Sequence, residues 1–330
     1  MINSKPVIIA CLISLVALSS LFLVSCFRPA ANYKPSGLPS LIAFASDRDV
    51  TPHIFTIKPD GSDVRATSND NYTVDGLPAW SPDGKKIAFA SDQSDDYEIW
   101  TMNEDGSGRQ KVSNRYGWDG MPRWSPDGSK IAFVSEVHDK VGDTSYEIFV
   151  INADGSGMKQ LTDSTTWGTV NNTSDETKIL GWNSAPTWSP DSSKILFASN
   201  RDSSSISPIL YIMNADGTDQ KKFGLFFNVD GTGPNWSPVT NQIVFIRGSA
   251  AKGDIWVMDG SSPFPLLNAK KLTTNLDNNY GPVWSPDGKQ IAYASDTYGK
   301  DNIFIMNADG TGVQRLTYSQ SNNDRNPAWR

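Results

Sequence analysis

A short frame, Pro-x-Trp-Ser-Pro, returns along this chain at a nearly regular interval. Its first copy opens a stretch that runs from Pro78 to Ser91 and reads Pro-Ala-Trp-Ser-Pro-Asp-Gly-Lys-Lys-Ile-Ala-Phe-Ala-Ser. The tryptophans of successive copies are 44, 64, 48, 48 and 45 residues apart. A repeat of about 40–50 residues indicates an array of four-stranded propeller blades. These tryptophans are Trp80, Trp124, Trp188, Trp236, Trp284 and, in a last copy reduced to Pro-Ala-Trp, Trp329.

Each unit divides into four predicted strands, which we call A to D. Strand A carries the tryptophan, and a Ser-Pro-Asp-Gly turn leads into an apolar strand B such as Ile87–Ala90. A second apolar run, strand C, ends in an Asn-x-Asp-Gly turn, as at Ile99–Met102 followed by Asn103–Ser107. Asp-Gly pairs between two such runs are strong hairpin signals. The last strand is short and polar, which suits an outer edge.

The two ends of the repeat array complement each other. The first unit begins with a strand B, Leu41–Ser46, and has no tryptophan strand of its own. The segment Pro327–Trp329 supplies the missing strand A from the other end. We therefore predict an all-β, six-bladed β-propeller over residues 40–330, closed by the C-terminal strand. The long stretch Asp163–Ala185 lacks a second Asp-Gly turn and is predicted to be an insertion.

These repeats resemble the TolB-type, WD-like propeller family, whose repeat also occurs in the N-terminal propellers of prolyl-oligopeptidase-like peptidases. The resemblance rests on Trp-Ser-Pro-Asp-Gly and Asn-x-Asp-Gly recurring together, and it covers about Leu41 to Arg330. It implies a six-bladed propeller. TolB itself has an α/β domain ahead of its propeller, whereas here only a short tether precedes Leu41. The partnership of TolB with a peptidoglycan-associated lipoprotein is therefore not carried over to this chain.

The first 25 residues have the order of a lipoprotein signal peptide. Lys5 precedes an apolar run from Val7 to Val24, and the run stops at Cys26 in a Leu-Val-Ser-Cys sequence. Signal peptidase would cut before Cys26, which would then carry the lipid. Residues 26–39 are predicted to be a lipidated tether. An uncleaved transmembrane anchor is the alternative, and both place the body outside the cytoplasm, at the outer membrane, periplasm or cell surface.

Charge and catalytic motifs limit the function classes. With 36 acidic against 29 basic residues, the chain is a poor partner for nucleic acid, so membrane attachment is expected through the lipid. Its two histidines, His53 and His138, fall in predicted B-to-C loops of different blades. No Gly-x-Ser-x-Gly elbow or zinc signature is present, so we predict that the chain is not an enzyme, although a carboxylate pair stays open.

Repeated aspartates occur in both kinds of turn. Short carboxylates at such positions accept backbone N–H bonds inside their own turn, and we expect this role here rather than calcium ligation. The eight are Asp83, Asp127, Asp191 and Asp287 in the A-to-B turns and Asp105, Asp154, Asp216 and Asp309 in the C-to-D turns.

A second repeated set, which we call the ring residues, lies five residues before each strand-A tryptophan. In a propeller these positions fall in the links between blades, near the axis on one face. Two roles stay open: a cap on the next blade, or a carboxylate and amide ring that binds a polar ligand or a cation, for which calcium is the best suited. The set is Asp75, Asp119, Asn183, Gly231 with Asp230 beside it, Asn279 and Asp324.

The B-to-C and D-to-A loops share one face and vary in length, whereas the other turns are mostly tight. Variable loops on a regular scaffold are where binding usually occurs. The longest belong to the third blade and its link to the fourth, at 136–147 and 163–185. Exposed Tyr and Trp side chains on such loops suit a protein or a sugar partner. The candidate binding aromatics are Tyr116, Trp118, Trp167, Trp182 and Tyr280.

Together these features predict a membrane-anchored, extracytoplasmic propeller that binds a protein or peptide on its loop-rich face without catalysis. A carbohydrate-binding or carbohydrate-processing surface protein is the first alternative, and a pure envelope scaffold is the second. No cofactor is expected beyond the candidate calcium. A glycan binder would need the loop aromatics, and a peptide or cation binder would need the ring residues.

Overall fold

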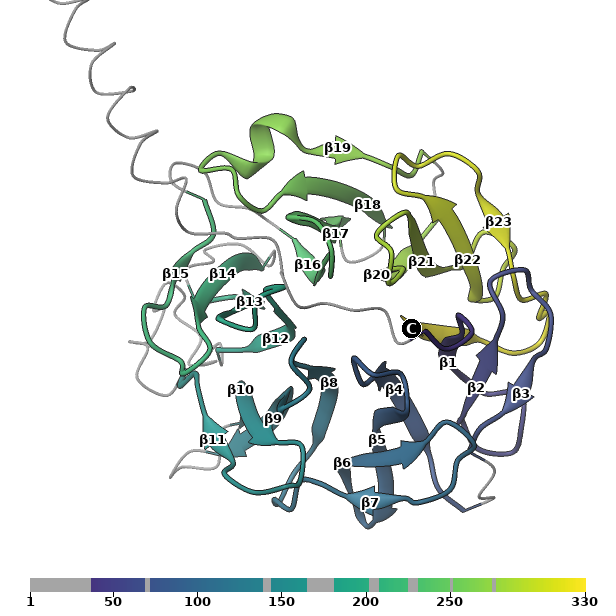
Figure 1. Cartoon of the computed structure of the whole chain (residues 1–330), viewed down its shortest axis with the longest axis horizontal. Helices are drawn as coiled ribbons and strands as arrows, with labels where there is room; N and C mark the ends of the chain where they lie inside the picture. Colours follow the sequence, from purple (N-terminus) through teal and green to yellow (C-terminus); the bar gives the residue numbers. More distant parts are fainter. Residues whose placement is uncertain are drawn as a thin grey trace, which may run out of the picture.

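Each Pro-x-Trp frame forms the end of an innermost strand in a four-stranded antiparallel sheet, and six such sheets are arranged in a ring (Figure 1). The six frame tryptophans line a channel at the axis of this ring. This computed structural model describes residues 37–68, 72–138, 144–164, 181–201, 208–224, 231–249, 252–274 and 277–330. The predicted signal peptide and Cys26 lie outside these ranges. Within them, no helix has the length and hydropathy needed to cross a membrane.

The strands follow the predicted A-to-D order in every blade. Strands A are β4 (Asp75–Trp80), β8 (Asp119–Trp124), β12 (Asn183–Trp188), β16 (Thr232–Trp236), β20 (Asn279–Trp284) and β24 (Asp324–Trp329). Strands B are β1 (Ile42–Ser46), β5 (Lys86–Ser94), β9 (Lys130–His138), β13 (Lys194–Ser199), β17 (Gln242–Ser249) and β21 (Gln290–Ser295).

Strands C and the short outer strands D complete each sheet. Strands C are β2 (His53–Ile57), β6 (Asp96–Asn103), β10 (Thr144–Asn152), β14 (Ile209–Asn214), β18 (Lys252–Asp259) and β22 (Asn302–Asn307). Strands D are β3 (Arg65–Ala66), β7 (Gln110–Lys111), β11 (Lys159–Gln160), β15 (Lys221–Lys222), β19 (Lys270–Lys271) and β23 (Gln314–Arg315), and a 3-10 turn, η1 (Pro265–Asn268), precedes β19.

The ring closes between the two ends of the described chain. Strand β24 pairs antiparallel with β1, with Ile42 opposite Trp329 and Ser46 opposite Asp324. The first sheet therefore has the order β24-β1-β2-β3. The predicted six blades and the predicted closing strand are confirmed. Closure buries the two blade faces that an open array would expose.

The core lies between blades rather than inside them. Ile42, Ala43 and Phe44 are consecutive in β1, and all three are fully buried. Side chains of successive strand residues point to opposite faces, so both faces of the sheet are covered, which explains why strands B are apolar without alternation. We number the blades 1 to 6 in chain order, with β24-β1-β2-β3 as blade 1 and β8–β11 as blade 3. Each hydrophobic cluster joins neighbouring blades; for example, Ile148 of blade 3 packs in one cluster with Phe197 of blade 4.

Every innermost strand contains the same backbone irregularity two residues after its ring position. There the pairing with strand B shifts by a β-bulge, and φ is positive, between 49° and 57°. A bulge turns the strand and re-aims the side chains that follow it. The described ring side chains before the bulge are buried, and the residue before each tryptophan, after the bulge, lines the channel. The six residues are Leu77, Met121, Ala185, Gly233, Gly281 and Asn326.

Non-glycine residues with positive φ carry strain that glycine avoids. We expect Ala185→Gly to leave the free energy of unfolding unchanged or to raise it by up to about 1 kcal/mol, because relief of strain offsets the entropy of glycine. Blades 5 and 6 already have glycine at this position. Denaturant unfolding of the purified variants measures the effect.

Ala79→Gly is the matched control, because Ala79 lies at a regular position in β4 with no positive φ. It should lower the free energy of unfolding by about 0.5–1 kcal/mol. Equal losses in the two variants would contradict a strained bulge.

Candidate binding site on the loop-rich face

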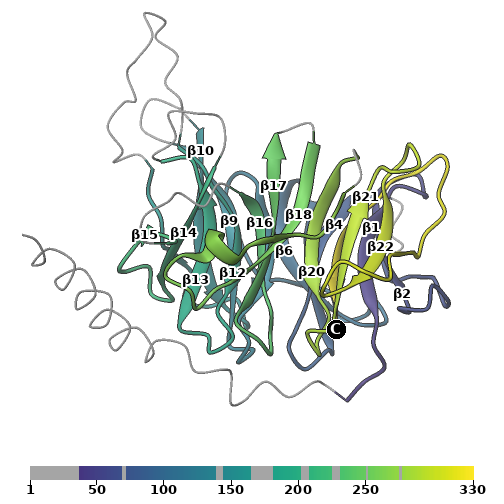
Figure 2. The same ribbon diagram turned by 90° about the horizontal axis from the view of Figure 1, so that it is seen from above.

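The two faces of the ring differ as the sequence predicts. Tight A-to-B and C-to-D turns form one face, where the C-terminus lies. The hairpins β9–β10 and β17–β18 extend on the opposite, loop-rich face (Figure 2). The loops of this face therefore connect strands that are fixed in the sheets of the ring.

All eight repeated turn aspartates bind within their own turns, as predicted. In the A-to-B turn of blade 3, Oδ1 of Asp127 accepts hydrogen bonds from the hydroxyl of Ser125 (2.6 Å) and the backbone N–H of Ser129 (2.9 Å). In the C-to-D turn, hydrogen bonds from Ser156 hold the pKa of the Asp154 carboxyl below its usual value. The same contacts occur at the other six positions.

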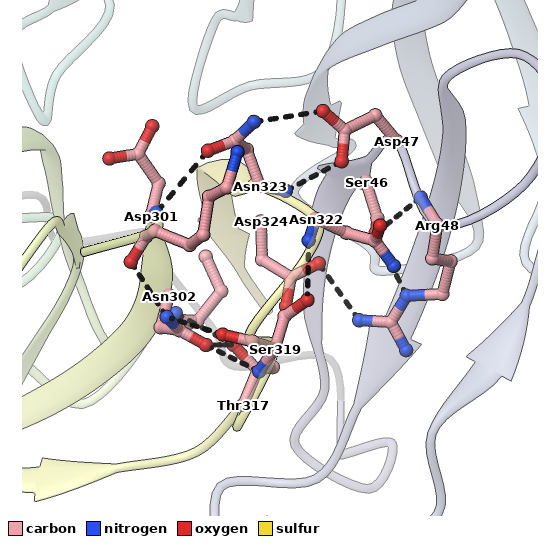
Figure 3. A network of polar contacts seen from close by, with 12 residues as sticks. Ser46, Asp47, Arg48, Asp301, Asn302, Thr317, Ser319, Asn322, Asn323 and Asp324 are labelled. Carbon is pink, nitrogen blue, oxygen red and sulfur yellow. Dashed lines mark hydrogen bonds and ion pairs between the residues drawn. The ribbon is translucent and has the colours of Figure 1, made fainter. Parts of the chain in front are cut away.

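The five ring residues that carry a carboxylate or amide and are described are almost completely buried. Asp75 accepts two hydrogen bonds from Arg109, both of 2.9 Å. Asp324 accepts one of 2.8 Å from Arg48, which Figure 3 shows within its network between blades 6 and 1. These arginines supply positive charge where a bound cation would sit. Asp230 lies outside the described residues.

The two remaining ring amides are also bound by neighbouring groups. Oδ1 of Asn183 accepts a hydrogen bond of 3.1 Å from Arg201, and its amide donates one of 2.8 Å to the Glu147 carboxylate. The amide of Asn279 donates to the backbone carbonyl of Gly253 at 3.0 Å. Asn183 and Asn279 thus connect adjacent blades through buried polar contacts, whereas Asp75 and Asp324 bind arginines of their own blades.

Backbone N–H groups in the links are capped mainly by another repeated set, the residue after the serine that ends the regular pairing of strand B. Asp47 binds the N–H of Asn323, and the two residues share a second hydrogen bond of 2.9 Å (Figure 3). Asp92 binds Val74 in the same way, at 2.7 Å. The capping residues of the other links are Glu136, Asn200 and Asp296. Sequence reasoning missed this set, although the Ser-Asp/Asn/Glu pairs at the ends of strands B mark it.

Asp119 differs from Asp75 and Asp324, the other described ring carboxylates, because no hydrogen bond joins it to an arginine. Its side chain is fully buried, and neither carboxyl oxygen accepts a hydrogen bond from a described donor. Burial raises the pKa of this carboxyl to about 6, and the nearby Glu98 carboxylate adds to the rise. The hydroxyl of Ser113 lies close but donates to Glu98 at 2.8 Å instead. Asp119 is therefore a buried acid that is neutral below about pH 6.

Several aromatic side chains of this face contact one another at blade 3, whereas other exposed tyrosines, such as Tyr298 and Tyr318 of blade 6, lie apart from them. Rings of Tyr116 and His138 have centroids 5.9 Å apart, and those of Trp118 and Tyr146 lie edge to face at 6.0 Å. Tyr146 also forms an isolated β-bridge with Trp182. We call Tyr116, Trp118, His138, Tyr146 and Trp182 the blade-3 patch. Tyr116 is 82% exposed and Tyr146 38%, whereas the two tryptophans are partly buried.

Contacts beneath the patch hold its members in place. Trp118 packs on the hydrophobic cluster of blades 3 and 4, and its backbone N–H binds the Glu136 carboxylate at 3.2 Å. Gly120 leaves room for the indole, because a Cβ there would clash with Trp118. Glu136 also lies 3.2 Å from Nε2 of His138. The patch therefore combines fixed apolar rings with a carboxylate and an imidazole.

The structure separates the other predicted aromatics from this patch. Tyr280 lies in β20 of blade 6, across the ring from blade 3, and Trp167 is outside the described residues (Figure 1). The expectation that both histidines lie in loops is wrong. His53 begins β2 and is buried, and His138 ends β9, because both strands extend further than their apolar runs.

The patch suits recognition of a partner surface better than chemistry. Aromatic rings of fixed orientation beside polar groups are the usual anchors of protein interfaces. In the part of the chain that the structure describes, no three His, Cys, Asp or Glu side chains lie together as a metal site. Calcium binding by the ring residues stays a prediction.

Replacing the buried acid Asp119 tests its charge. Because its folded-state pKa is above the unfolded value near 3.8, the folded state binds the extra proton between about pH 4 and 6, and stability falls as pH rises through that window. Asp119→Asn should thus raise the free energy of unfolding by about 1–3 kcal/mol at pH 7.5, and by much less at pH 4. Denaturant unfolding at both pH values measures this.

Asp75→Asn is the matched control, because it weakens a paired carboxylate and leaves Arg109 without its partner charge. It should be destabilising at pH 7.5, by about 1–3 kcal/mol. Loss of stability in Asp119→Asn at pH 7.5 would contradict an unpaired buried charge. The same unfolding experiment with calcium, after chelation, tests the predicted cation ring.

The sequence matches the family model described as the TolB beta propeller domain over residues 68–180 and 226–330. These two segments make up more than half of the chain. No curated protein matches the sequence significantly.

Solved structures with the same fold come from several kinds of protein. TolB from Acinetobacter baumannii is similar with a TM-score of 0.68 and 21% identity, over 88% of this chain and 66% of that chain. A chain of a nidogen/laminin complex gives 0.64 and 13%, over 88% and 98%. The tricorn protease gives 0.58 and 17%, over 76% of this chain and 23% of its own. At these identities the likeness shows the fold alone, and with the family match over most of the blades, this chain belongs to the TolB beta-propeller family.

Proposed function

We propose that this propeller is a non-catalytic binding module, anchored to a membrane outside the cytoplasm, that recognises a protein or peptide through the blade-3 patch. The observation that carries the proposal is a set of mutually contacting aromatic residues at blade 3, two of them exposed tyrosines, on the loop-rich face. Tyr116 and Tyr146 present ring surface to solvent. The ring of Tyr116 lies beside His138, and Tyr146 contacts Trp118 edge to face and forms a backbone bridge with Trp182.

A protein partner would have to bind the aromatics rather than the ring residues expected for a peptide, because the described ring residues are buried and Asp75 and Asp324 are paired with arginines. The energetics of the patch favour such a partner. Tyrosine rings bury a large area with few rotatable bonds, so they lose little conformational entropy on binding. His138 and Glu136 add polar contacts at the edge of the rings. Among the similar structures, one comes from an assembly of two different proteins, nidogen with laminin, which supports protein binding by this kind of ring.

The proposal of binding without catalysis rests on the hydrogen bonds and ion pairs that already occupy the carboxylates. The described turn aspartates are bound inside their turns, Asp75 and Asp324 are paired with arginines, and the unpaired Asp119 is fully buried, away from a substrate in solution. Groups held in this way are poor acids and bases for a substrate. The extracytoplasmic anchor rests on the signal-like sequence that ends at Cys26.

Crosslinking from the patch in living cells tests the site. A photoreactive phenylalanine analogue at position 116 or 146 of the full chain should give discrete crosslinked proteins. Purified partner should then bind the double variant Tyr116→Ala, Tyr146→Ala at least about tenfold more weakly, because truncated hot-spot aromatics each cost about 2 kcal/mol. The melting temperature of this variant should stay close to that of the parent.

Position 313 is the matched control, because Val313 is 57% exposed in a C-to-D turn on the other face. The same products from position 313 would show nonspecific capture. No protein products from any position, together with binding of the parent chain to glycans that fails in the double variant, would replace the peptide hypothesis with the carbohydrate one.

The membrane anchor has its own test. Cys26→Ser should abolish incorporation of labelled fatty acid and leave the uncut precursor, because the thiol is the acylation site. Lys5→Ser, which keeps the cysteine, should retain lipid labelling. Equal fatty-acid labelling of Cys26→Ser and the parent would contradict a lipoprotein.

A further inference from the structure

A cavity lies at the opposite end of the channel from the blade-3 patch. It has a volume of about 560 Å³ and is lined by the six frame tryptophans and the residue before each of them. A cavity of this size accepts a small organic molecule or the end of a peptide. The six preceding residues, which we call the channel ring, are Ala79, Arg123, Thr187, Asn235, Val283 and Ala328.

The channel ring is polar on one side and apolar on the other. Its polar members, Arg123, Thr187 and Asn235, come from the consecutive blades 3, 4 and 5. The apolar members come from blades 6, 1 and 2 and complete the circle. A ligand in this cavity therefore meets hydrogen-bonding groups on one wall and hydrocarbon on the other.

The polar wall offers donors. Oδ1 of Asn235 accepts the N–H of Trp284 at 2.9 Å, which fixes the amide and leaves its NH₂ group for other partners. The hydroxyl oxygen of Thr187 accepts the N–H of Trp236 at 3.2 Å, so its proton stays available. With the guanidinium of Arg123, three adjacent blades present N–H and O–H groups.

Arg123 carries a positive charge that no described carboxylate pairs. Its guanidinium donates a hydrogen bond of 2.9 Å to the adjacent backbone carbonyl of Pro122. Protein surrounds the side chain and lowers the pKa of the guanidinium to about 10, so the group is still protonated at neutral pH. A cation held in such a place is stabilised by an anion that satisfies its donors.

The other charged groups at this mouth already have partners. Arg330 lies 2.8 Å from the Glu104 carboxylate and stacks on Trp80. Asp287 accepts the Ser285 hydroxyl at 2.7 Å inside its own turn, near Lys289. Among the described charged residues that line the cavity, Arg123 is thus the one without an ion-pair partner.

We propose that this cavity binds a carboxylate that carries a small apolar group, with the carboxylate on Arg123, Thr187 and Asn235 and the apolar group against the wall of Ala79, Val283 and Ala328. An apolar residue at a peptide C-terminus has this chemistry, and so does a free amphipathic acid. The site is separate from the blade-3 patch and does not depend on it.

Titration calorimetry on the full chain in neutral detergent tests the site with N-acetyl-leucine as the probe. The matched probe is N-acetyl-leucinamide, which keeps the shape and removes the charge. We expect the acid to bind at least tenfold more tightly than the amide. Arg123→Gln should remove this difference, Arg123→Lys should keep part of it, and Arg65→Gln, at an exposed arginine on β3, should keep all of it.

Equal binding of acid and amide, or an unchanged preference in Arg123→Gln, would overturn the proposal. If Arg123→Gln does not fold, the acid-to-amide ratio of the parent and of Arg123→Lys still decides it. A pentapeptide ending in leucine distinguishes the sources: binding at least tenfold tighter than N-acetyl-leucine identifies a chain end as the ligand, and weaker binding identifies a small acid. Both of these outcomes support the carboxylate site.

Discussion

The architecture depends on the burial of each blade face against the next blade. Strands B such as β1 are apolar on both faces, and each buried aliphatic or aromatic side chain contributes about 1.5–3 kcal/mol. No blade can bury both faces alone, so the array has to close. The pairing of β24 with β1 completes the circle, and it also fixes the channel and the two faces on which binding can occur.

Blade 3 departs from the regular pattern at both ends of its innermost strand. β8 begins with Asp119, the ring carboxylate without an arginine, and contains Arg123, a channel cation without a carboxylate. The other described ring carboxylates each have an arginine partner: Asp75 pairs with Arg109, and Asp324 pairs with Arg48. In the same blade the β9–β10 hairpin is long, and Tyr116 and Tyr146 are exposed. Unbalanced charge and exposed aromatics on one blade are expected where a repeat scaffold has been adapted for binding.

Much of the fold could be predicted from the sequence, because short local patterns that repeat along the chain determine it. Asp-Gly turns, apolar runs and the frame tryptophans specify strands, blade number and closure, and Asp127 shows that even the turn contacts follow. The bulge at Leu77 and its equivalents could not be predicted, since four of the six residues there are not glycine. Neither could the arginines that bind Asp75 and Asp324, because Arg48 comes from a B-to-C loop and Arg109 from a C-to-D turn. The aromatic patch was predicted only as scattered loop residues, because their proximity depends on how blades 3 and 4 pack.

Hydroxyl-radical footprinting of tyrosines, in living cells and on the purified full chain, tests most directly whether blade 3 is the occupied surface. Four of the six exposed tyrosines in the described residues are compared: Tyr116 and Tyr146 in the patch, and Tyr298 and Tyr318 on blade 6. The account predicts that the two patch tyrosines lose reactivity in cells while the blade-6 pair keeps it. Equal reactivity of all four tyrosines in cells and in the purified protein would contradict it.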